Sequence, residues 1–118
     1  MEAANHEVLH IGPLEIRSAE FVVLADGAPL PFTPHELYLL TALARRAGRI
    51  VSREELFAVV WDKDRRPDDR TVDVYVRKLR RKLEAALPGW RFIHTHFGFG
   101  YRFSPEPSHV FHTTATSP

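Results

Sequence analysis

The segment from Asp69 to Ala86 constrains the fold of this chain more than any other. Its large apolar side chains recur at the spacing i, i+4, i+7 and i+11, at Val72, Val76, Leu79 and Leu83. That spacing places all four on one face of a continuous helix. The segment therefore predicts one helix that packs on a core along a single stripe.

The opposite side of this predicted helix is mostly basic. It carries Arg70, Asp73, Val74, Arg77, Lys78 and Arg81. A surface helix stabilised by salt bridges is the alternative, but residues 65–82 contain eight basic side chains against three acidic ones. Unmatched like charges three and four residues apart repel one another. The pattern indicates contact with nucleic acid, in which cations meet phosphates and guanine edges and Val74 meets a thymine methyl group. Asp73 can pair with Arg77 at i+4 or accept from a cytosine amine.

The distribution of charge is more informative than the net charge of +1. Residues 1–36 hold one basic side chain and six acidic ones, the reverse of the balance in residues 65–82. Such polarity suits a protein that turns one face toward a polyanion, although a solvated basic face would look the same.

Short strands are expected in the N-terminal third, over residues 8–11, 14–17, 21–24 and 28–32. Apolar and β-branched residues fill them, and Asp26-Gly27 is a strong hairpin turn signal. The last of the four contains Pro29 and Pro31, so it can only be a short edge strand. These strands predict a four-stranded antiparallel sheet.

Two further helices begin with capping signals. Thr33 and Glu36 form a capping box with Pro34 at the first helical position, and Gly48 ends that helix. Ser52 and Glu55 repeat the pattern before a second helix that reaches Trp61. A polar loop over residues 62–69 follows, and Asp68 or Asp69 caps the third helix.

After Pro88-Gly89, residues 90–96 and 99–103 predict two strands around Gly98. The expected fold class is therefore α+β, a winged helix-turn-helix with an N-terminal four-stranded antiparallel sheet, three helices and a C-terminal β-hairpin wing. We expect a flexible N-terminus at residues 1–7, the folded domain at 8–104 and a disordered tail at 105–118, because the tail is rich in Pro, Ser and Thr.

Other classes of protein are disfavoured. The chain has no cysteine, no apolar run of about 20 residues and no secretory signal at its start, which predicts a cytoplasmic location without membrane contact. No Ser-His-Asp spacing, phosphate-binding glycine loop or matched carboxylate pair is present, so neither an enzyme nor a bound cofactor or metal is expected.

Four motifs, in order, carry a resemblance to a known family. They are residues 32–37 (FTPHEL), residues 48–56 with Trp61 (GRIVSREEL…W), residues 70–83 (RTVDVYVRKLRRKL) and residues 98–103 (GFGYRF). Over residues 8–103 the chain resembles the effector domain of OmpR/PhoB-type response regulators. The resemblance implies a bacterial transcription factor that binds double-stranded DNA at tandem half-sites, with a possible head-to-tail dimer on DNA.

The resemblance also assigns roles to particular residues. Base readers would be Asp73, Val74, Arg77 and Lys78, on a recognition helix at 69–86. Phosphate contacts would come from Trp61, Arg70, Thr71, Arg80 and Arg81, and wing contacts from Thr95, His96 and Phe97, within a wing at 94–101. The loop containing Asp62, Lys63, Asp64, Arg65 and Arg66 would face RNA polymerase.

Two positions depart from the family pattern. Phe97 stands where an arginine usually precedes the first wing glycine, and Lys78 stands where arginine is frequent. Phenylalanine cannot supply the cation that a narrow minor groove favours, so Phe97 would pack on sugars, wedge at a base step or rest on the protein. The missing arginine keeps open an alternative, a protein-docking module with little DNA affinity of its own.

Several aromatic and histidine residues have a simpler interpretation. Trp61, Trp90, Tyr101 and Phe103 are expected in the core, with the Trp61 indole N–H still able to reach a phosphate. His94 and His96 lie two apart on one strand, where surface positions are favoured over phosphate contacts and a metal pair is the least favoured.

Overall fold

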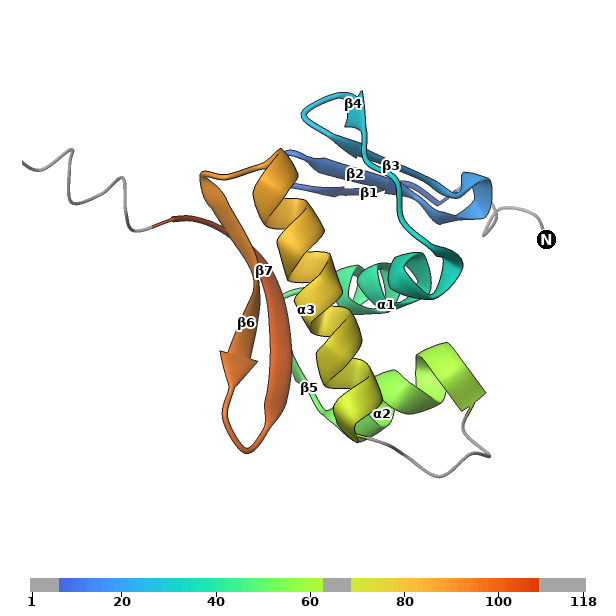
Figure 1. The fold of residues 1–118 in the computed structure, drawn as a ribbon, viewed down its shortest axis with the longest axis vertical. Coiled ribbons are helices and arrows are strands. Elements are labelled where there is room, and N and C mark those ends of the chain that lie inside the picture. The colour runs from blue at the N-terminus through green and yellow to red at the C-terminus, as the bar shows by residue number, and fades with distance from the viewer. Residues whose placement is uncertain (1–6, 63–68, 109–118) are drawn as a thin grey trace, which may run out of the picture.

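The computed structural model describes residues 7–62 and 69–108, without the side chains of residues 62 and 69. Within these residues the order is sheet, helices and hairpin, as predicted. Strands β1 (Leu9–Ile11), β2 (Leu14–Arg17), β3 (Val22–Ala25) and β4 (Ala28–Pro29) form an antiparallel sheet in that order. Helices α1 (Pro34–Arg45), α2 (Arg53–Phe57) and α3 (Asp69–Ala86) follow, and β6 (Trp90–His96) and β7 (Gly100–Pro107) form the hairpin (Figure 1).

The local signals at the helix starts are confirmed. The Thr33 hydroxyl accepts from the Glu36 N–H, and the Glu36 carboxylate accepts from the Thr33 N–H. The Ser52 hydroxyl likewise accepts from the Glu55 N–H at 3.1 Å. The Glu55 carboxylate instead accepts from Arg46 and Arg49, each at 3.0 Å, which ties α2 to the end of α1.

The N-terminal sheet corrects two of the predicted boundaries, since β4 ends at Pro29 rather than at residue 32 and β3 begins after Phe21. Phe21 was expected to begin a strand, but it ends a short 3₁₀ turn, η2 (Ser18–Glu20), with a φ of +55°. Its N–H donates to the Ser18 carbonyl, which turns the chain before β3 begins at Val22. The Asp26-Gly27 hairpin is confirmed, since both residues have positive φ and Ala25 pairs with Ala28.

The wing sheet contains a strand that the sequence pattern did not indicate. The two-residue strand β5 (Ile50–Val51) pairs with β7, so the order is β5-β7-β6. The close approach of the two strands requires Gly100. A Cβ there would lie 2.0 Å from the Val51 carbonyl oxygen.

The end of the wing also differs from the prediction. Residues 105–107 were assigned to the tail, but they extend β7 and pair with the start of β6, at Arg91–Glu106 and Trp90–Pro107. The prolines are tolerated because β5 reaches only as far as Arg102 along β7, and because the β6–β7 register shifts between Arg91 and Ile93. The Ser108 N–H then donates to the Gly89 carbonyl.

The predicted second helix is divided in the structure. The α-helical part ends at Phe57, and a π-helical segment, η3 (Ala58–Asp62), continues to Trp61. The core lies between the three helices and the two sheets, and the predicted stripe of α3 is confirmed, with exposed fractions of 0–3%. Among the described residues no helix is long and apolar enough to cross a membrane.

Candidate nucleic-acid interface

The outer surface of α3 is basic along most of its length. Arg70, Arg77, Lys78 and Arg81 are exposed, and Val74 is 42% exposed among them. Arg70, Val74, Arg77 and Arg81 fall at i, i+4, i+7 and i+11, so they form one row opposite the buried stripe. We call these five residues the α3 outer face.

An aromatic cluster borders one side of the α3 outer face. The half-buried Trp61 ring stacks on His35 and Phe57, with centroids 5.7 and 5.5 Å away, and meets the edge of Tyr75 at 5.1 Å. The Lys78 ammonium lies 4.7 Å from the centre of the Tyr75 ring. The cluster fixes Trp61 against Tyr75, whose ring also contacts Lys78, on the helix that carries the predicted phosphate contacts.

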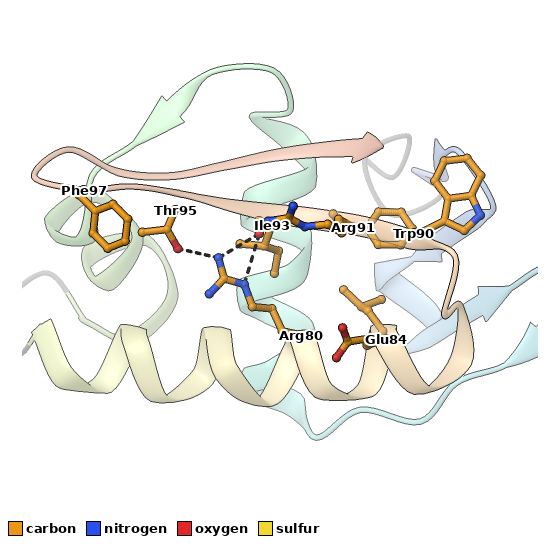
Figure 2. Close-up of a pocket in the computed structure, with 9 residues that line it drawn as sticks. Arg80, Glu84, Trp90, Arg91, Ile93, Thr95 and Phe97 are labelled. Carbon is orange, nitrogen blue, oxygen red and sulfur yellow. Dashed lines mark hydrogen bonds between the residues drawn. The ribbon is translucent and has the colours of Figure 1, made fainter. Parts of the chain in front are cut away.

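Arg80 borders the other side and joins α3 to the wing. Its guanidinium donates to the Ile93 carbonyl at 2.9 and 3.2 Å and to the Thr95 hydroxyl at 2.6 Å (Figure 2). Burial lowers the pKa of Arg80 from its ordinary value. Two residues predicted to touch DNA, Arg80 and Thr95, are therefore bonded to each other across the groove between α3 and β6.

That groove has a volume of about 450 Å³. Arg80, Glu84, Arg91 and Thr95 line it together with apolar side chains, and Phe97 closes the end near the hairpin turn (Figure 2). The groove connects the wing with the side of α3.

Asp73, predicted to read a base, is held by two other elements. Its carboxylate accepts from Arg53 Nε at 2.8 Å and from the Tyr101 hydroxyl, which links α3 to α2 and to β7. The carboxylate is therefore engaged with these groups rather than with Arg77. Burial and the hydrogen bond to Asp73 together raise the pKa of Tyr101.

Arg53 is the site residue that the sequence reasoning missed. Its guanidinium carbon lies 5.1 Å from the Tyr101 ring centre, and that of Arg80 lies 5.7 Å away. One signal could have identified Arg53. It is a cation in the first turn of a helix, where the helix dipole favours acidic side chains such as Glu54 and Glu55 over basic ones.

The wing turn carries two exposed aromatic rings, Phe97 at 88% and Phe99 at 71%. The Phe99 N–H donates to the His96 carbonyl, and Gly98 has a φ of +85°. His96 is half-buried and accepts from Arg102 at 3.1 Å.

The expectation of a surface position for His94 is wrong. His94 is buried, and its Nε2 lies 2.9 Å from the Ser104 carbonyl oxygen of β7. Within residues 7–62 and 69–108 no group of three metal-ligating side chains could hold an ion. The loop predicted to face RNA polymerase, from Asp62 to Arg66, lies outside the described side chains.

Comparison with known proteins identifies the family. The model of the family "Transcriptional regulatory protein, C terminal" matches residues 27–103. The chain belongs to this family.

Individual relatives agree with the assignment to this family, the C-terminal domains of transcriptional regulatory proteins. The chain is 40% identical over 104 residues to the transcriptional regulatory protein AfsQ1 of Streptomyces coelicolor, covering 88% of this chain and 46% of AfsQ1. It is 39% identical over 103 residues to the phosphate regulon transcriptional regulatory protein PhoB of Escherichia coli, covering 86% of this chain and 44% of PhoB. The chain thus spans less than half the length of these relatives.

Solved structures confirm the winged helix-turn-helix fold. The DNA-binding domain of CpxR from E. coli superposes with a TM-score of 0.73 at 33% identity, over 83% of this chain and 96% of that one. The Klebsiella pneumoniae RstA DNA-binding domain, in complex with the RstA box, superposes with a TM-score of 0.74 at 29% identity. The match covers 86% of this chain and 100% of the RstA domain.

Proposed function

We propose that this domain binds duplex DNA at specific sequences and thereby regulates transcription, with α3 in the major groove. The observation that carries the proposal is the α3 outer face, whose four exposed cations surround one small apolar side chain. An α-helix fits the major groove of B-DNA, where cations meet phosphates and guanine edges and an apolar group meets a thymine methyl. The similarity to the RstA domain, solved with its DNA box, supports the same function.

The proposed roles follow from where each side chain lies. Val74, Arg77 and Lys78 face outward and are proposed to read bases. Phosphates would be bound by Arg70 and Arg81, at the two ends of the α3 outer face, and by three side chains beside it, Trp61, Thr71 and Arg80. Asp73 is proposed as a positioning residue, because Arg53 and Tyr101 already occupy its carboxylate.

Family membership extends the proposal to the whole regulator. Two domains would occupy tandem half-sites head to tail, and the loop from residue 62 to 66 would contact RNA polymerase. A response regulator of a two-component system is the proposed context, because the solved relatives include the response regulator DrrB of Thermotoga maritima, an OmpR/PhoB homolog.

The test is a selection of duplex fragments with the purified domain, followed by titration of the selected duplex at several salt concentrations. We expect an enriched repeat and an affinity that falls steeply with salt, since each neutralised phosphate releases counterions. Arg77→Ala should lower affinity for the selected site by about 1–3 kcal/mol and relax the base preference at one position. Arg81→Ala should weaken all sequences alike.

The control is Arg17→Ala, which removes an exposed cation from β2, away from α3. It should leave both affinity and preference unchanged. Weak binding to every duplex at low salt would contradict the proposal and favour a protein-docking module. Equal losses on every sequence for Arg77→Ala and Arg81→Ala would contradict the assignment of base readers.

A further inference from the structure

The tip of the wing combines full exposure with apolar chemistry. Phe97 and Phe99 flank Gly98, and their exposed fractions exceed those of all other large apolar side chains in the described part of the chain. By contrast, Phe57, Phe92 and Phe103 are buried in the core. Two highly exposed aromatic side chains within three residues of one turn indicate a contact surface, since single exposed apolar residues are common but several on one turn are not.

The exposure of Phe97 excludes one of its three expected roles. With 88% of its surface exposed, the ring does not rest on the protein. Its ring lies on the α3 side of the hairpin, at the end of the groove that Arg80 and Thr95 line (Figure 2). The two roles that remain for Phe97 are packing on sugars and wedging at a base step.

The tip is held in register with the α3 outer face. Thr95, two residues before Phe97, is bonded to Arg80 of α3, and Ile93 accepts from the same guanidinium. Figure 1 shows the hairpin turn at the same end of the molecule as the start of α3. A duplex bound along α3 would therefore bring the adjoining groove to the tip.

The wing tip contains no lysine or arginine that could contact the adjoining DNA groove. Residues 95–101 contain neither lysine nor arginine. The nearest following cation, Arg102, donates to His96 at 3.1 Å and to Glu106 at 3.4 Å. The large exposed side chains that the tip can present to DNA, Phe97 and Phe99, are therefore apolar.

We infer that the wing tip is an apolar minor-groove contact, in which Phe97 and Phe99 pack on the sugars and base edges of the groove beside the half-site. This inference rests on the proposed function and adds how the wing binds. Apolar side chains that enter a minor groove favour base steps that unstack easily, such as TA and CA/TG. The wing should therefore disfavour stiff A-tracts, whose narrow groove attracts cations.

The test compares salt dependence among wing variants on the selected duplex. Phe97→Ala and Phe99→Ala should each weaken binding by about tenfold, the lower part of the range for one stacked aromatic side chain. The slope of log affinity against log salt should not change, because no phosphate contact is lost. Phe97→Arg should steepen that slope by about 0.9 and should prefer an A-tract at the flanking position where the wild type prefers TA.

Matched controls separate this inference from the proposed function. Phe21→Ala removes another exposed phenylalanine, 58% exposed and far from the wing, and should leave affinity unchanged. Wild-type affinity in Phe97→Ala and Phe99→Ala, with the expected loss in Arg77→Ala, would overturn only the wing inference. A flatter salt slope in Phe97→Ala would also overturn it. Absence of salt-dependent binding by the wild type would overturn the proposed function itself.

Discussion

The recognition helix and the wing are fixed to the core in different ways. Helix α3 is held by side chains, with Val72, Val76, Leu79 and Leu83 almost completely buried. The wing is held both by buried side chains, such as Phe92 and Phe103, and by its backbone, because β7 pairs with β6 on one edge and with β5 on the other. The helix therefore tolerates changes on its outer face, whereas the wing depends on strands that approach closely.

Their outer surfaces also differ in chemistry. The α3 outer face offers four cations, and the wing tip offers two phenyl rings. Ionic contacts weaken with salt and apolar contacts do not, so the two regions should contribute separable parts of one affinity. Breaking each attachment in turn tests how far the two regions are independent.

The largest effect is expected from Gly100→Ala in the wing. A Cβ at this position would lie 2.0 Å from the Val51 carbonyl oxygen and 2.8 Å from its carbon, both in backbone, while φ is +138°. Neither atom can move without breaking the β5–β7 pairing. We expect a loss of unfolding free energy of about 3 kcal/mol or more, measured by urea denaturation.

Gly98→Ala is the matched control, because both glycines belong to the wing and have positive φ. No atom lies within 4 Å of a Cβ at Gly98, where φ is +85°. Only backbone strain remains, which costs about 1–2 kcal/mol. Similar losses for the two variants would show that crowding against Val51 is not what requires Gly100.

The next effect concerns the link between the two regions. Asp73→Ala removes the acceptor shared by Arg53 and Tyr101, and Tyr101→Phe removes one donor while keeping the ring. We expect losses of about 1–2 kcal/mol for Asp73→Ala and about 1 kcal/mol for Tyr101→Phe in urea denaturation. DNA affinity should fall for all sequences alike, because the wing and helix lose their fixed relation. A changed preference at one base position in Asp73→Ala would instead identify Asp73 as a base reader.

Local chemistry accounts for the parts of the fold that the sequence predicted well. Thr33 with Glu36, Asp26 with Gly27, and the apolar stripe of α3 each act within four residues or along one helix, so their signals are visible in the sequence itself. The predicted boundaries were wrong where strand pairing places residues of low β propensity in a strand. Pro105 and Pro107 lie in a strand because β6 pairs with this part of β7, while β5 pairs with β7 only as far as Arg102.

The candidate site was less predictable for a related reason. Arg53 and Asp73 are 20 residues apart and Asp73 and Tyr101 are 28 apart, so only the tertiary fold reveals that they meet. The same holds for β5, since two residues carry no periodicity and become a strand only through β7. The basic face of α3 needed no tertiary information, because helical spacing alone defines it.

The smallest effect is expected at the side of α3 that faces α1, where Lys82→Met breaks an attachment of the helix alone. Lys82 donates to the buried Glu36 carboxylate at 2.6 Å. Burial alone would raise the pKa of Glu36, but the hydrogen bonds from Lys82 and the Thr33 N–H hold it below its ordinary value. A depressed carboxyl pKa adds stability above the unfolded value, about 4.3, and that stability is lost as pH falls through the folded value.

Lys82→Met should cost about 1 kcal/mol at pH 7, less than a fully buried pair because Lys82 is 36% exposed. The loss of stability between pH 7 and pH 4 should be smaller than in the wild type, because the pKa of the Glu36 carboxyl is no longer held as low. Urea denaturation at pH 7, 5 and 4 measures this difference. Wing-dependent DNA affinity should stay unchanged, and in Glu36→Gln the same substitution should cost much less. An equal cost in both backgrounds would show that Lys82 acts through its contacts with Phe32 and the Pro31 carbonyl rather than through Glu36.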